Sequence, residues 1–355
     1  MEEHSRRFLR ELLTAISPSG YEEEAAAVIK AEAAAFADEV LVDVHGNVTV
    51  VVNKGGGPRV MLAGHMDEIG LQVTNIDDRG FLRFTTIGGW DPQIPQGQRV
   101  WVKTAGGRIP GVIGKKAIHL LRGEARKKVV DFNDMWIDIG ARNGEEARSK
   151  VAVGDCAVLA HDYMELGNDL FTARGIDNRA GAFVVMEAAR RLAEMDIQAE
   201  VHAVATVQEE IGLRGAVTSG YRIQPDVAIA VDVTHATDDP GMKNDRERMG
   251  DIRLGGGPVI TRGPNVNPRL FDLITQVAGE EGIPLGVEAE PRGTPTDANV
   301  LQLARGGTAT ALISIPNRYM HTPVEMASLK DLAWLYQLLA ATVARIGPGT
   351  SFIPW

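Results

Sequence analysis

The most informative segment of this chain is Val201-His202-Ala203-Val204-Ala205-Thr206-Val207-Gln208-Glu209-Glu210, an alternating strand-like run that ends on two adjacent carboxylates. Side chains on a strand point alternately to opposite faces, but this constraint relaxes where a strand ends. Glu209 and Glu210 can therefore both reach one site, where one binds a metal ion and the other transfers a proton. Taken alone, the pair is more simply explained as two solvated side chains at a strand-to-loop junction.

Four further apolar runs end in polar residues in the same way. These ends are His65-Met66-Asp67-Glu68 after Arg59–Gly64, Asp177-Asn178 after Phe171–Ile176, Asp232-Val233-Thr234-His235 after Asp226–Val231, and His321 shortly after Thr310–Pro316. Ligands of open α/β sheets bind outside the carboxyl ends of the strands. A set of imidazole and carboxylate ligands without a thiolate suits two divalent metal ions of intermediate softness, such as zinc.

Each of these residues also has an ordinary structural explanation when it is considered alone. His65 can be a hydrogen-bonded structural histidine, and Asp177 can be the N-cap of a helix over Ala180–Met195. Asp232 can be a turn residue, and His321 can lie in a surface loop. Five such coincidences at five strand ends are improbable, so the sequence predicts one joint site.

The same residues carry a resemblance to a known family. The matching segments are Gly64–Gly70, Gly175–Gly181, Gln208–Ala216, Val231–His235 and Arg318–Glu325. Their order and separations resemble those of the tetrahedral (TET) aminopeptidases, a family of dinuclear-metal peptidases. The family includes glutamyl and deblocking aminopeptidases and proteins labelled endoglucanase M, and the resemblance covers nearly the whole chain.

The resemblance implies a role for each site residue. One divalent ion would be bound by His65, Asp177 and Asp232, and a second by Asp177, Glu210 and His321, with Asp177 bridging the two. Glu209 would be the general base and later the general acid, and Asp67 would orient His65 without being a ligand. The Asp177–Asn178 peptide bond would be cis. Zinc is the expected metal, with cobalt or manganese as alternatives.

The implied reaction is metal-assisted hydrolysis that releases N-terminal residues from short peptides with a free N-terminus. His235 is a further candidate for stabilising an oxyanion, although a hydrogen-bonded loop histidine explains it better. The element Gly293–Asn299 is a candidate for substrate recognition, or simply the start of a helix.

Two other enzyme classes compete with the aminopeptidase. A carboxypeptidase or deacylase could use the same metal core, with Arg292 or Arg318 binding a substrate carboxylate. A glycosidase could use two carboxylates as acid and base. The glycosidase would leave the histidines without a role, and an aromatic content of 5% offers few platforms for sugar rings.

The predicted fold is a three-layer α/β/α catalytic domain with a mixed, zinc-peptidase-like sheet, interrupted by a small all-β barrel or sandwich. Helical periodicity nearly disappears after residue 69, where short alternating segments are separated by glycines. Strands alternate with helices again from Asp177 onward. We therefore expect the catalytic domain at 1–68 and 164–355 and an inserted β domain at 69–163. The resemblance implies that this insert mediates oligomerisation, as dimers that build a dodecamer.

Composition fits a soluble cytoplasmic enzyme. The 355 residues are 44% hydrophobic with a formal net charge of −10, which argues against a nucleic-acid partner. Cys156 is the single cysteine, so an internal disulfide is excluded. The first residues of the chain do not show a signal-peptide pattern. No apolar run is long enough to predict a membrane-spanning helix. The apolar tail Ser351–Trp355 is expected to pack against its own or a neighbouring subunit.

Overall fold

The computed structural model describes residues 1–355, and its main body is an eight-stranded mixed sheet. The strand order is β1-β2-β12-β3-β13-β16-β14-β15. The central strands β12, β3, β13 and β16 are parallel neighbours, and β2 and β14 join them antiparallel. The bounds are β1 Glu39–Val42, β2 Val48–Val52, β3 Arg59–His65, β12 Glu200–Thr206, β13 Val227–His235, β14 Val259–Arg262, β15 Gly286–Ala289 and β16 Ala309–Asn317.

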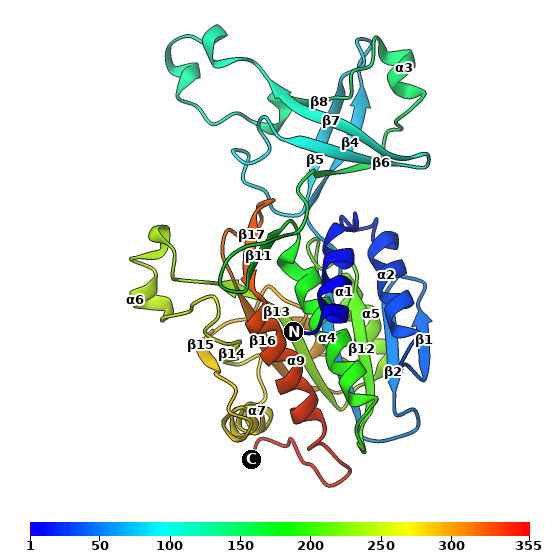
Figure 1. The fold of residues 1–355 in the computed structure, drawn as a ribbon, viewed down its shortest axis with the longest axis vertical. Coiled ribbons are helices and arrows are strands. Elements are labelled where there is room, and N and C mark those ends of the chain that lie inside the picture. The colour runs from blue at the N-terminus through cyan, green and yellow to red at the C-terminus, as the bar shows by residue number, and fades with distance from the viewer.

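Helices cover both faces of this sheet, which confirms the predicted three layers (Figure 1). Side chains along β3 point alternately to the two faces of the sheet. Val60 and Leu62 belong to the hydrophobic cluster on one face, and Met61 and Ala63 belong to the cluster on the other. The larger cluster includes residues of α1 Glu3–Thr14, α2 Glu23–Ala33, α4 Ile176–Leu192, α7 Pro268–Glu280 and α9 Leu329–Val343. The smaller one includes residues of α5 Arg214–Ile223 and α8 Ala298–Leu301.

The segment after β3 forms a separate lobe, a closed barrel in the order β4-β5-β8-β7-β6-β9 (Figure 1). The sequence predicted a barrel or a sandwich, and the structure shows a barrel. Its strands are β4 Gly70–Ile76, β5 Leu82–Ile87, β6 Arg99–Thr104, β7 Gly107–Lys115, β8 Met135–Asp138 and β9 Cys156–Leu159, with the short α3 Gly144–Arg148 beside them. The lobe has its own core, in which Leu71, Val73, Val100 and Ile137 are buried.

Polar contacts fasten the barrel to the sheet domain near the start of α2. Lys103 Nζ donates to the Tyr21 carbonyl at 2.9 Å and forms an ion pair with Glu23 at 2.6 Å. Tyr21 accepts a hydrogen bond from Gln72 Nε2 at 2.7 Å, and its hydroxyl donates to the Gly154 carbonyl. The barrel is thus held against the sheet domain on the side where β3 ends.

Three local predictions need correction. The sequence Ser19-Gly20-Tyr21-Glu22 has the pattern of a capping box and so predicts a helix start at this point, but α2 begins at Glu23 and Ser19 instead donates to the buried Asp67. The strand before Asp177, β11 Leu170–Ala173, does not belong to the main sheet. It pairs with β10 Met164–Glu165 and β17 Glu325–Ser328 in a small separate sheet. Asp177 does not cap α4 but lies at its kinked start with non-helical backbone angles, and Asn178 Oδ1 accepts the Gly181 N–H instead.

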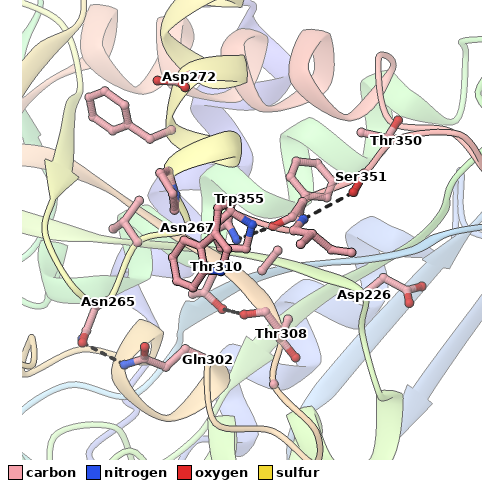
Figure 2. A pocket seen from close by; sticks show the side chains of 18 of the residues that line it. Asp226, Asn265, Asn267, Asp272, Gln302, Thr308, Thr310, Thr350, Ser351 and Trp355 are labelled. Atoms are coloured by element: carbon pink, nitrogen blue, oxygen red, sulfur yellow. Dashed lines mark hydrogen bonds between the residues drawn. The ribbon is translucent and has the colours of Figure 1, made fainter.

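The C-terminal tail crosses the far end of the sheet domain and walls a cavity of about 1130 Å³ (Figure 2). Asn267 Nδ2 donates to the Phe352 carbonyl at 2.8 Å, and Phe352 packs against the main core. Ile353 and Trp355 remain 70% and 97% exposed. Phe352 thus packs on its own subunit, which is one of the two arrangements expected for the tail, and packing on a neighbouring subunit stays a prediction. No helix of the structure has the length and apolar character needed to cross a membrane.

Candidate metal centre

The predicted site residues meet beside the carboxyl ends of β3, β12, β13 and β16. His65 ends β3, Glu209 and Glu210 follow β12, Asp232 lies near the end of β13, and His321 follows β16 through a short loop. Asp177 reaches the same place from the first turn of α4. The peptide bond from Asp177 to Asn178 is cis, as the resemblance implies.

The distances show that the predicted ligand atoms form one compact cluster. His65 Nε2 lies 3.2 Å from Asp177 Oδ1 and 4.0 Å from Asp232 Oδ1. His321 Nε2 lies 3.3 Å from Asp177 Oδ2 and 3.4 Å from Glu210 Oε1. The two oxygens of Asp177 thus face different histidines, an arrangement that suits a carboxylate bridging two ions.

The cluster fits a metal in its chemistry and its burial. Two groups of side chains have ligand atoms within 4.8 Å of one another, namely His65, Glu209 and Asp232, and His65, Asp177 and Glu210. His65, Asp177 and Asp232 are buried, and Glu210 Oε1 is a buried oxygen without a hydrogen-bond partner. Buried carboxylates are costly unless paired or bound to a cation. This donor set of imidazole and carboxylate groups is one that zinc and similar ions prefer.

Crowding of the carboxylates shifts their proton affinities strongly. Burial, together with Asp232, raises the pKa of Glu209 to about 10. Burial and Asp177 raise the pKa of Glu210 above its usual range. The carboxylates of Asp177 and Glu210, 3.3 and 3.4 Å from its Nε2, raise the pKa of His321 to about 11. Strongly shifted groups gathered in one cavity are typical of a functional site.

Asp67 organises the site from behind. Its Oδ1 lies 3.4 Å from His65 Nδ1 and accepts the Glu209 N–H at 3.0 Å, while Oδ2 accepts the Glu210 N–H at 3.2 Å and the Ser19 hydroxyl at 2.6 Å. The Asp67 carbonyl also accepts from His65 Nδ1 at 3.1 Å. Asp67 therefore contacts His65, as expected, and also holds the turn that carries both glutamates.

Two supporting residues were missed at the sequence level. Glu325 is 2% exposed, and its carboxylate accepts the Asp177 N–H at 3.0 Å and the His321 N–H at 2.8 Å. The Gly89 carbonyl of the barrel lobe accepts from His321 Nδ1 at 2.9 Å, which leaves Nε2 free for a metal. The sequence signal for Glu325 is its place at the end of the matching segment Arg318–Glu325, four residues after His321, whereas Gly89 has no such signal.

The remaining candidates divide between the cavity and the surface. Thr294, Thr296 and Asn299 of the predicted recognition element line the cavity above the cluster. His235 is exposed at the end of β13 and does not line that cavity. Arg318 is paired with Asp238 through bonds of 2.6 and 2.7 Å.

Comparisons with known proteins agree over most of the chain. A family model described as M42 glutamyl aminopeptidase matches residues 46–338. The lysyl aminopeptidase of Pyrococcus furiosus is 41% identical over 315 residues, which cover 88% of each chain. A solved TET aminopeptidase from a marine sediment archaeon of the Thaumarchaeota has a TM-score of 0.92 at 37% identity, covering 98% of this chain and 97% of that chain. The TET1 peptidase of Pyrococcus horikoshii, described as assembling into a tetrahedron or a large octahedral shell, has a TM-score of 0.86 at 32% identity, covering 96% and 100%.

Proposed function

The chain belongs to the M42 glutamyl aminopeptidase family, and we propose that it releases N-terminal residues from short peptides. In this reaction Glu209 would be the general base. As a member of this family it is an aminopeptidase, a hydrolase that acts on peptide bonds. The proposed mechanism rests on one observation: two histidines and four carboxylates, most of them buried, form a cluster beside the four strand ends.

We further propose that the site holds two divalent ions, zinc before cobalt or manganese. His65, Asp177 and Asp232 would hold one ion, and Asp177, Glu210 and His321 the other. Such ions, when bound, supply Lewis acids that polarise a carbonyl and acidify water. Imidazole and carboxylate donors bind several of these metals, so availability decides which one is used.

Glu209 would move the proton that hydrolysis requires. It would accept a proton from the attacking water and later deliver it to the leaving amine. Burial, together with the neighbouring Asp232 carboxylate, raises the pKa of Glu209 to about 10, and cations held beside it would lower that pKa towards the range that a general base needs. Asp67 would keep Glu209 in place by accepting its backbone N–H and would fix the ring of His65.

The geometry gives less support to the competing enzyme classes. A carboxypeptidase needs a free cation for the substrate carboxylate, whereas Arg318 is paired with Asp238 and Arg292 is exposed. A glycosidase would leave His65 and His321 without a role. Glucan cleavage that survives chelation would favour the glycosidase.

We propose residues 69–163 as an inserted domain that mediates assembly, with residues 1–68 and 164–355 forming the catalytic domain. Dimers would build a homo-oligomer such as a dodecamer, located in the cytoplasm. The likeness to a TET1 peptidase described as a tetrahedral or octahedral assembly supports this proposal. A closed shell would limit the substrates to short or unfolded peptides.

The test uses the purified full-length protein. It is stripped with a chelator, reloaded separately with zinc, cobalt and manganese, and assayed on one peptide in free and N-acetylated forms. We expect chelation to abolish cleavage, metal to restore it, and acetylation to suppress it. Full activity in protein shown by elemental analysis to hold no metal would refute the metal mechanism. Equal rates on both peptides would point to an endopeptidase or a deacylase.

A further inference from the structure

The cavity above the metal centre has a volume of about 470 Å³ and two chemically different parts. Its floor consists of the predicted metal ligands and Glu209. Its walls carry no charged side chain, and the residues that shape them are Leu213, Val233, Thr294, Thr296, Asn299 and Met320. The floor thus carries the charge of this cavity, and the walls are neutral.

The polar wall residues are already hydrogen-bonded to one another. Asn265 Nδ2 donates to Thr294 Oγ1 at 3.0 Å and to Asn299 Oδ1 at 3.1 Å, and the hydroxyls of Thr294 and Thr296 lie 2.8 Å apart. Gln302 Nε2 donates to Asn265 Oδ1 at 2.8 Å, the contact drawn in Figure 2. This network anchors the wall in the body of the sheet domain and provides no ion to pair with a substrate charge.

Two acidic side chains near the wall, Glu288 and Asp297, do not line the cavity. Asp297 is 3% exposed, accepts the Thr206 hydroxyl at 2.6 Å, and does not line the cavity. Glu288 accepts the hydroxyls of Thr234 at 2.8 Å and Thr261 at 2.9 Å. Neither carboxylate is therefore presented to a basic side chain in the cavity.

We propose that this aminopeptidase selects substrates whose N-terminal side chain is uncharged, and that Thr294, Thr296 and Asn299 are specificity-determining residues. The proposal rests on the function proposed above, because the first side chain must enter this cavity when its carbonyl carbon reaches Glu209. A charged side chain placed against neutral walls loses water without gaining a partner. The expected preference differs from the lysyl activity in the name of the Pyrococcus furiosus relative and from the glutamyl activity in the family description.

The first experiment compares matched pairs of fluorogenic aminoacyl amides on the metal-loaded full-length enzyme. Norleucine is compared with lysine and glutamine with glutamate, so that each pair differs in charge at similar size. We expect kcat/KM to favour the uncharged member of each pair at least tenfold. Equal or faster cleavage of the lysine or glutamate substrate would overturn the preference and leave the aminopeptidase function intact. Absence of cleavage of every substrate would instead contradict the proposed function.

The second experiment places one negative charge in the wall. Asn299→Asp keeps the side-chain shape and the oxygen that accepts from Asn265. We expect the lysine-to-norleucine ratio of kcat/KM to rise at least tenfold and the glutamate-to-glutamine ratio to fall. Asn75→Asp is the matched control, because Asn75 is exposed on the barrel, and both ratios should stay at the wild-type values. Unchanged ratios in folded Asn299→Asp would refute the role of the wall. If that variant does not fold, the wild-type substrate pairs still decide the proposal.

Discussion

Glu325 offers the sharpest test of how the metal centre is held together. It is buried, and its two oxygens accept the backbone N–H groups of Asp177 and His321 at 3.0 and 2.8 Å. In Glu325→Gln, the amide oxygen can still accept one of these N–H groups, but the amide NH₂ faces the other. A buried donor left without an acceptor costs about 1–3 kcal/mol.

This cost should appear as weaker metal binding, because both N–H groups belong to predicted ligands of one ion. Since 1.4 kcal/mol corresponds to about a factor of ten, we expect that ion to bind about 10- to 100-fold more weakly. Activity should recover when excess metal is supplied, since Glu209 is untouched.

The assay equilibrates wild type and variant in buffers of graded free zinc and measures bound zinc by elemental analysis together with peptidase activity. Glu187→Gln is the control for loss of a buried carboxylate. Glu187 is 1% exposed, bonds Ser5 at 2.8 Å, and lies about 15 Å further along α4 from Asp177. Glu187→Gln should bind zinc as the wild type does. If folded Glu325→Gln takes up both ions at wild-type zinc concentrations, the assigned role of Glu325 is wrong.

Three further predictions concern the proton, the metal and the assembly. Glu209→Gln should keep its bound metal and lose about 10²–10⁴-fold in turnover, whereas Glu210→Gln should lose metal first. Elemental analysis combined with kinetics distinguishes the two variants. The opposite pattern would mean that the roles of the two glutamates are exchanged. Metal binding should release protons, because the pKa of His321 is raised to about 11, so its imidazole is protonated at neutral pH and must lose the proton to become a ligand. Affinity should therefore rise with pH, and calorimetry in buffers of different protonation enthalpy should show proton release; zero release would contradict the histidine's role. Light scattering of the metal-loaded protein at micromolar concentration should give a multiple of the 38.2 kDa chain mass, and a strictly monomeric mass would exclude the proposed assembly.

The sequence predicted the strand ends well, because β3, β12 and β13 are apolar runs that change abruptly to acidic or histidine residues. The same reasoning failed at β11, since Phe171 and Ala173 alternate like a strand of the main sheet yet pair with β10 and β17. Periodicity reports which face of an element is buried, but it does not identify the partner strand.

The supporting contacts could not be predicted for a related reason. Gly89 and His321 are brought together only by the docking of the barrel on the sheet domain, and a backbone carbonyl leaves no mark in composition. Ser19 fitted a local capping pattern, but the carboxylate of Asp67, distant in sequence, is its actual partner. Tertiary contacts thus replaced the local rule at this position.

The position of the barrel between β3 and β12 also orders events during synthesis of the chain. β3 is complete at His65, but its two neighbours, β12 and β13, begin only at Glu200 and Val227. At about 5–20 residues per second, β3 waits on the order of ten seconds on the ribosome with both edges unpaired. All six barrel strands emerge within that interval, and three of their six pairings join consecutive strands, so the barrel can close before β12 appears. The half-made sheet domain, and not the barrel, is therefore the part of the nascent protein that needs protection from aggregation.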